Sequence, residues 1–130
     1  MSAPLVPAIL LLEDEPIILM DLEYAVEDLG LRAICATGVA EALTLLETAQ
    51  GLIAAVLDVS LARGQTCVPV ARELERLGVP FLLHSGDLNR DDETVQRLGV
   101  QHITKPANAD NVIAAAVGLA GHGVPQTAAL

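Results

Sequence analysis

The chain has 130 residues, of which 52% are hydrophobic, and its formal net charge is −10. This length suits one domain with a single core, and the apolar content excludes a disordered chain. The excess of acid disfavours a nucleic-acid-binding protein, because phosphate recognition needs a basic face. No apolar run approaches the ~20 residues of a membrane span, and acids directly follow the apolar start, so we expect a cytoplasmic protein without a signal peptide or membrane contact.

Strands and helices are predicted to alternate along the chain. Short unbroken apolar runs are typical of strands buried on both faces, whereas apolar residues that recur every three or four positions indicate helices. Glycine or proline near most boundaries supports these limits. In chain order, the expected strands are residues 8–12, 32–36, 52–57, 81–85 and 102–104, and the expected helices are 17–29, 38–50, 68–77, 91–98 and 108–119.

The first helix alternates apolar residues with acids, as an amphipathic helix on a sheet does. The apolar members of this predicted pattern are Ile17, Ile18, Tyr24, Ala25 and Leu29. Residues 112–120 of the last helix carry no charge at all. The outer face of that helix should therefore expose alanines, which form a modest patch for a partner or a second copy, unless they are simply inert.

Five strand–helix alternations with short links predict an α/β fold, a doubly wound parallel sheet with helices on both faces. No internal repeat and no linker interrupts the pattern. We therefore expect a single domain over residues 1–130, with a core at about 8–119. Glycines at 118, 121 and 123, followed by Pro125, predict a flexible tail over residues 121–130, too short for an output module.

Polar side chains follow four of the five predicted strands. Glu13 and Asp14 follow the first strand, Asp58 the third, Ser85 ends the fourth, and Lys105, the only lysine, follows the fifth. The carboxyl ends of parallel strands share one edge of the sheet, so these groups should meet. Three carboxylates repel one another unless a cation intervenes, and an all-oxygen set suits Mg²⁺.

The simplest chemistry for such a site is attack of Asp58 on a phosphoryl donor to form an acyl phosphate. Each feature also has a plainer explanation. Residues 13–15 are also typical of an acidic helix N-terminus. Lys105 and Pro106 are compatible with an ordinary strand-to-helix turn, and Ser85 with a polar residue at a strand end. The combination at successive strand ends favours the metal and phosphoryl interpretation.

This order of residues resembles the receiver domain of two-component response regulators, over about residues 8–119. The anchors are residues 13–16 (Glu-Asp-Glu-Pro), Asp58, Ser85–Gly86 and Lys105–Pro106. The resemblance implies a flavodoxin-like (βα)5 fold with strand order 2-1-3-4-5. It also implies a sensor histidine kinase or histidine phosphotransfer protein as phosphoryl donor and a downstream protein partner. A homodimer through the last helix and the face of the fifth strand is a further expectation.

The resemblance also assigns roles to single residues. Asp58 would be the phosphoryl acceptor, and Asp58 and Asp14 would bind Mg²⁺ together with the backbone carbonyl of Ser60. Glu13 would assist directly or through water. The phosphoryl-binding and switch residues would be Ser85, Gly86, Lys105 and His102.

Several positions depart from the family pattern. His102 stands where an aromatic residue usually rotates with the hydroxyl, and Glu13 replaces the usual aspartate. The loop after Asp58 has Leu61–Ala62 in place of Met-Pro and Gln65–Thr66 in place of Asp-Gly. Residues 78–81 and 84–87 resemble those of stand-alone receivers that accompany general stress-response kinases, which carry Pro-Phe before an Ala-Thr-Gly-Tyr strand end, although His84, Ser85 and Asp87 depart from that pattern. Asp87, two residues past Ser85, is expected to affect the lifetime of the phosphoryl group.

Three functions compete at this point. The first is a phosphorylated stand-alone receiver that switches a partner and is not a turnover enzyme. The second is a receiver-like binding module that is never phosphorylated, which the unusual loop and His102 would suit. The third is a metal-dependent phosphohydrolase, disfavoured because Ser60 stands where such enzymes usually carry a second acid.

Overall fold

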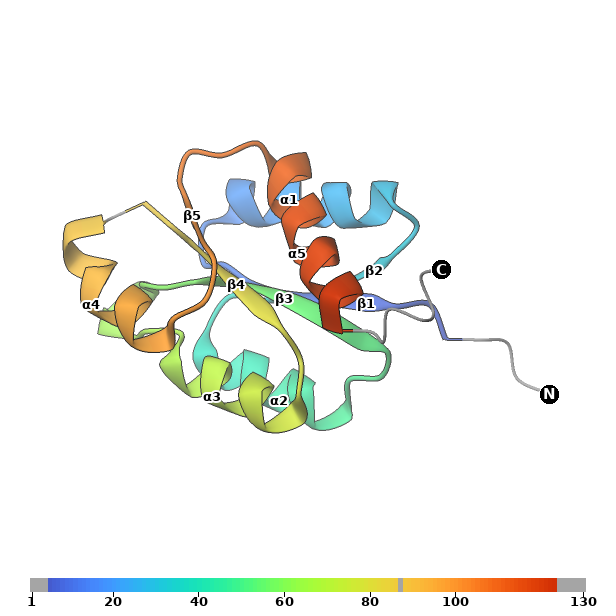
Figure 1. Cartoon of the computed structure of the whole chain (residues 1–130), viewed down its shortest axis with the longest axis horizontal. Helices are drawn as coiled ribbons and strands as arrows, with labels where there is room; N and C mark the ends of the chain where they lie inside the picture. The colour runs from blue at the N-terminus through green and yellow to red at the C-terminus, as the bar shows by residue number, and fades with distance from the viewer. Residues whose placement is uncertain (1–4, 87, 124–130) are drawn as a thin grey trace.

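The computed structural model describes residues 5–86 and 88–123 of the chain. Five parallel strands form one sheet in the order β2-β1-β3-β4-β5 (Figure 1). This arrangement confirms the predicted fold class and strand order. The elements are β1 (Ala8–Leu12), α1 (Pro16–Asp28), β2 (Arg32–Ala36), α2 (Val39–Thr48), β3 (Leu52–Asp58), the short 3₁₀ helix η1 (Ala62–Gly64), α3 (Val68–Leu77), β4 (Phe81–Ser85), α4 (Leu88–Leu98), β5 (His102–Thr104) and α5 (Ala109–Gly123).

The core has two halves, one on each face of the sheet. In β1, Leu10 and Leu12 point into the half beneath α2 and α3, whereas Ile9 and Leu11 point into the half covered by α1 and α5. All five residues of β1 are buried, because a central parallel strand is covered on both faces. This explains why the strand lacks the polar–apolar alternation of a half-exposed strand.

The apolar face of α1 differs from the predicted one. Ile17, Tyr24 and Leu29 are 67%, 56% and 56% exposed, so three of the five residues predicted for it are wrong. Ile17 and Tyr24 are seven positions apart and share one face of the helix, away from the sheet. The stripe that packs against the sheet has the proper helical spacing and consists of Ile18, Leu22, Ala25 and Val26.

The ends of α4 and α5 differ most from prediction, whereas those of α1 and α2 differ by one or two residues. Helix α5 continues through Gly118 and Gly121 to Gly123, so the predicted tail does not begin at residue 121. A glycine weakens a helix by about 1 kcal/mol relative to alanine, but it does not end a helix that packing supports. Here Val112, Ile113 and Ala116 of α5 are fully buried in the core on this face of the sheet. Helix α4 begins at residue 88 rather than 91, since no Gly or Pro interrupts residues 88–91.

The topology brings the polar strand ends together. The strand order reverses between β1 and β3, and their carboxyl ends lie side by side at this switch point, where open α/β sheets bind ligands. Residues 13 and 14 leave β1 there, and Asp58 ends β3. Among the described helices, none is long and apolar enough to cross a membrane.

Candidate functional site

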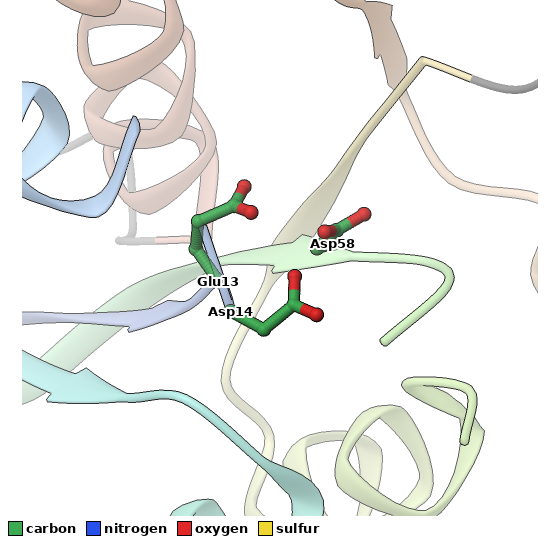
Figure 2. Close-up of side chains that lie close together, drawn as sticks. All are labelled: Glu13, Asp14 and Asp58. Atoms are coloured by element: carbon green, nitrogen blue, oxygen red, sulfur yellow. The ribbon is translucent and has the colours of Figure 1, made fainter. Parts of the chain in front are cut away.

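Three carboxylates meet at the switch point. One ligand oxygen each from Glu13, Asp14 and Asp58 lies within 4.8 Å of the others, and the side chains gather at the ends of β1 and β3 (Figure 2). Glu13 is 1% exposed and Asp58 5% exposed, whereas Asp14 is half-buried. The backbone fixes Glu13, whose N–H donates to the Ala36 carbonyl at 3.0 Å. The three acids predicted to bind a metal are thus in one place.

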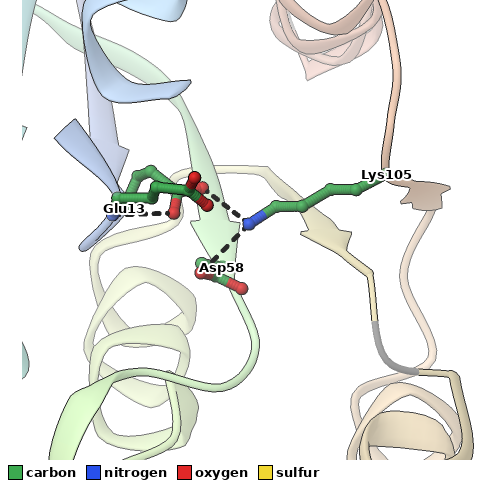
Figure 3. A network of polar contacts seen from close by, with 4 residues as sticks. Glu13, Asp58 and Lys105 are labelled. Carbon is green, nitrogen blue, oxygen red and sulfur yellow. Dashed lines mark hydrogen bonds and ion pairs between the residues drawn. The ribbon is translucent and has the colours of Figure 1, made fainter. Parts of the chain in front are cut away.

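Lys105 reaches this cluster from the end of β5. Its Nζ lies 2.9 Å from Glu13 Oε1 and 3.2 Å from Asp58 Oδ2 (Figure 3). The contact with Asp58 is a hydrogen bond, whereas Glu13 Oε1 is buried and accepts no well-aligned hydrogen bond. The other oxygen of Glu13 accepts one from the Glu15 N–H at 3.1 Å. One ammonium therefore bridges two buried carboxylates.

The positive charge of Lys105 only partly compensates the negative charges of the cluster. Burial raises the pKa of Asp58 to about 7, with a further increase from Glu13, and Lys105 only partly opposes both. Burial works against the ammonium of Lys105, but its contacts with Glu13 and Asp58 outweigh burial and raise its pKa. The site thus favours additional positive charge.

A divalent cation fits the donor set. Three ionised carboxylates and one ammonium leave a net charge of −2, and all the metal donors among the described side chains of the cluster are oxygens. Hard oxygen donors with a partly open rim suit Mg²⁺, which keeps several of its waters. Glu13 Oε1, which is buried and has only the ion pair with Lys105, and the half-buried Asp14 are the natural first ligands.

Ser85 and Gly86 lie beside the same lysine. Ser85 is buried at the end of β4, and its carbonyl accepts a hydrogen bond from the Lys105 N–H at 3.0 Å. Gly86 packs so that a Cβ there would lie 3.5 Å from Lys105 Cβ. The Lys105–Pro106 peptide bond is cis. The structure thus brings these predicted switch residues to the cluster, while their roles stay predictions.

The loop after Asp58 is short and closed. Ser60 pairs with Thr66 in an antiparallel bridge, and the Leu61 N–H donates to the Gln65 carbonyl at 2.8 Å. Arg63 has a φ of 62°, a left-handed conformation uncommon for residues other than glycine. The loop is therefore an ordered turn despite its atypical sequence. Metal binding by the Ser60 carbonyl stays a prediction.

Of the two remaining predicted residues, the structure describes His102 but not Asp87. His102 is partly buried on β5, in register with Leu83 of β4, and its Nε2 is buried without a hydrogen-bond partner among residues 5–86 and 88–123. Its role as a switch residue stays a prediction. Asp87, predicted to affect phosphoryl lifetime, lies outside the described residues.

Sequence reasoning found no role for His84, and the structure gives it an unusual position. It pairs in register with Asp58, is 3% exposed, and neither ring nitrogen has a hydrogen-bond partner in the part of the chain that the structure describes. Burial lowers the pKa of its imidazole to about 4, with further lowering by Lys105 and His102. The signal in the sequence is a histidine in a strand otherwise apolar from Phe81 to Leu83.

Comparison with solved structures places this geometry in a family. A response regulator receiver protein from Sinorhizobium medicae aligns with a TM-score of 0.79 and 23% identity, over 92% of this chain and 98% of its own. A CheY-like receiver domain protein from Methanospirillum hungatei aligns with a TM-score of 0.78 and 18% identity, over 92% of this chain and 97% of its own. SdrG from Sphingomonas melonis is 34% identical and aligns with a TM-score of 0.73, over 92% of this chain and 98% of its own. The chain belongs to the response regulator receiver domains.

This receiver is distant in sequence from most of the solved structures it resembles. Searches with family models and against curated proteins matched nothing. Its membership therefore depends on near-complete coverage in both directions and on the 34% identity to SdrG. As in the predicted arrangement, the receiver places its acidic residues and lysine at the carboxyl edge of the sheet.

Proposed function

We propose that this receiver accepts a phosphoryl group on Asp58 in a Mg²⁺-dependent reaction and thereby switches a protein partner. The observation that supports this most is the contact of Lys105 Nζ with Asp58 Oδ2 at 3.2 Å, inside a cluster of three carboxylates. A nucleophilic carboxylate beside a fixed cation can approach a phosphoryl donor despite the repulsion between negative charges. The donor would be a sensor histidine kinase or a histidine phosphotransfer protein.

In the proposed transfer, an oxygen of Asp58 attacks the phosphorus atom of a phosphohistidine. The new P–O bond makes an acyl phosphate, and the broken P–N bond leaves its electron pair on the donor's imidazole nitrogen. Lys105 is already within 3.2 Å of the nucleophile and neutralises charge on the transferred oxygens. When bound by Glu13, Asp14, Asp58 and the Ser60 carbonyl, Mg²⁺ would supply further neutralisation of the phosphoryl oxygens.

The switch follows from the added charge. Phosphorylation places about −1.5 to −2 charge and new acceptor oxygens where one carboxylate stood. Lys105 then has a stronger partner, and the hydroxyl of Ser85, which is buried at the end of the adjacent strand, would donate to one of the new acceptor oxygens. Because Lys105 and Ser85 also share a backbone hydrogen bond, the end of β5 would shift with β4. His102 on β5 would transmit that shift.

The wider function belongs to the same proposal. The receiver would act as a signalling switch in a cytoplasmic phosphorelay, including a stress-response pathway, rather than as a turnover enzyme or a DNA-binding protein. Self-association through α5 and β5 is supported by Ala114, exposed on α5, and by Val117 and Leu119, which are only partly buried. A strictly monomeric protein, with and without phosphorylation, would contradict the homodimer.

Incubation with acetyl phosphate and Mg²⁺ tests the proposed function. We expect the intact protein to gain the mass of one phosphoryl group, no gain when EDTA removes the metal, and no gain in Asp58→Asn. Asp28→Asn, which alters an exposed aspartate at the end of α1, is the matched control and should be phosphorylated like the wild type. Absence of a gain with acetyl phosphate and with histidine kinases would favour the phosphorylation-independent binding module.

A further inference from the structure

Glu13 has one carboxylate oxygen left to offer a cation, and Lys105 contacts it. Oε2 of Glu13 accepts a hydrogen bond from the Glu15 N–H at 3.1 Å, whereas Oε1 lies 2.9 Å from Lys105 Nζ (Figure 3). Glu13 is 1% exposed, and no described residue donates a well-aligned hydrogen bond to Oε1. A metal that binds Glu13 through Oε1 would therefore meet the lysine at the same buried oxygen.

Asp58 differs from Glu13 in this respect. Its Oδ2 accepts the hydrogen bond from Lys105 Nζ at 3.2 Å, and the carboxylate has a second oxygen on its other side. One oxygen of Asp58 also belongs to the cluster of possible metal donors with Glu13 and Asp14. Asp58 can therefore serve the lysine and a metal at the same time, which Glu13 cannot do.

The side chain of Lys105 can move while its backbone stays in place. The Lys105 N–H donates to the Ser85 carbonyl at 3.0 Å, which fixes the end of β5 against β4. The side chain is only 17% exposed, but it lines a cavity of about 240 Å³ together with Ile18 and Leu22 of α1. This space lets the lysine leave Glu13 without a rearrangement of the sheet.

We propose that Mg²⁺ displaces Lys105 from Glu13 but not from Asp58. In the metal-free receiver the ammonium takes the place of a metal cation at Glu13 Oε1, and in the metal-bound receiver it contacts the phosphoacceptor alone. The physical reason is repulsion, because two cations at one buried oxygen have little water between them to screen their charges. The inference rests on the metal site of the proposed function and adds that the metal frees the lysine for the phosphoryl oxygens.

NMR spectroscopy of the wild-type protein tests the exchange directly. Lys105 is the only lysine of the chain, so selective labelling identifies its ε-methylene group without ambiguity. Without metal, we expect nuclear Overhauser effects from this group to the Glu13 γ-methylene and to the Asp58 β-methylene. Saturation with Mg²⁺ should remove the first and keep the second. Persistence of both in protein that has bound Mg²⁺, or loss of the contact with Asp58, would overturn the proposal.

A double-mutant cycle separates this exchange from general charge repulsion. Lys105→Met should tighten Mg²⁺ binding, measured by calorimetry, by about 30-fold, because it removes both a competitor and a positive charge. Glu13→Asp shortens the side chain by about 1.5 Å and takes its oxygens out of reach of the lysine. In that background Lys105→Met should tighten binding only about threefold, which is the effect of charge alone.

Arg63→Met is the control, since it removes an exposed positive charge from the loop after Asp58, and it should change Mg²⁺ affinity by less than about twofold. Equal effects of Lys105→Met in the two backgrounds would contradict competition at Glu13 and leave the metal site intact. Absence of Mg²⁺ binding in the wild type would contradict the metal site of the proposed function, and the exchange with it.

Discussion

Asp58→Asn is expected to stabilise the metal-free protein at pH 8. Burial and the neighbouring Glu13 raise the pKa of Asp58 from 3.8 to about 7, so ionised Asp58 is disfavoured in the folded state. A shift of this size sets an upper limit of about 4 kcal/mol on the gain, and we expect about 1–4 kcal/mol once relaxation of the site is included. Urea denaturation followed by circular dichroism measures this difference in the free energy of unfolding.

The pH dependence of this gain has a definite sign. The pKa of Asp58 is higher in the folded protein than in the unfolded chain. The contribution of this carboxyl group to the free energy of unfolding is therefore fully present below about pH 4 and is lost as pH rises to about 7. The advantage of Asp58→Asn should therefore shrink at pH 5. His84 acts oppositely, because its pKa of about 4 lies below its ordinary 6.5, so stability falls as pH drops through that interval. Both proteins retain His84, so their difference isolates Asp58.

Asp28→Asn provides the control, since Asp28 is exposed and lies outside the cluster. Its free energy of unfolding should change by at most about 0.5 kcal/mol at either pH. A gain for Asp58→Asn that is absent at pH 8, or equal at pH 5 and pH 8, would contradict the burial of an uncompensated charge at this strand end.

Asp14→Asn is expected to remove stabilisation of the fold by Mg²⁺. If Glu13, Asp14 and Asp58 hold the ion, Mg²⁺ at ten times its dissociation constant should stabilise the wild type by about 1.4 kcal/mol. Loss of one carboxylate charge a few ångströms from a divalent ion should weaken binding by about 100-fold. At the same Mg²⁺ concentration the variant should then show almost no thermal shift.

Glu15→Gln is the matched control for this experiment. Glu15 adjoins Asp14, is exposed and contributes no oxygen to the cluster, although its N–H donates to Glu13. Because that bond uses the backbone, the variant should keep it and respond to Mg²⁺ like the wild type. An equal loss in both variants would indicate diffuse attraction by the acidic turn instead of a metal site.

The sequence was sufficient to predict the sheet and the position of the site. Unbroken apolar runs such as residues 8–12 have one good interpretation as buried strands, and polar residues at their ends must meet at one edge in a parallel sheet. The cluster of Glu13, Asp14 and Asp58 follows from these two rules. Helix limits and faces were less well predicted, because they depend on which stripe the sheet covers.

Three features could not be predicted from the sequence and became clear only from the structure. In α1 both faces carry large apolar residues, and only packing shows that Leu22 is buried while Ile17 is exposed. The glycines at the end of α5 resemble a helix stop in the sequence, and only the structure shows that α5, whose Ile113 is buried in the core, continues past them. His84 attracted no hypothesis, because one histidine in a strand says nothing about whether its nitrogens have partners or whether a cavity adjoins it.

The central claim is that Asp58 becomes an acyl phosphate, and reduction with borohydride tests it most directly. Borohydride converts an aspartyl phosphate to homoserine, which peptide mass spectrometry locates in the sequence. After treatment with acetyl phosphate and Mg²⁺, we expect homoserine at position 58 and unmodified aspartate at position 14. Homoserine at any other position, or none in protein that has gained phosphoryl mass, would contradict the assignment.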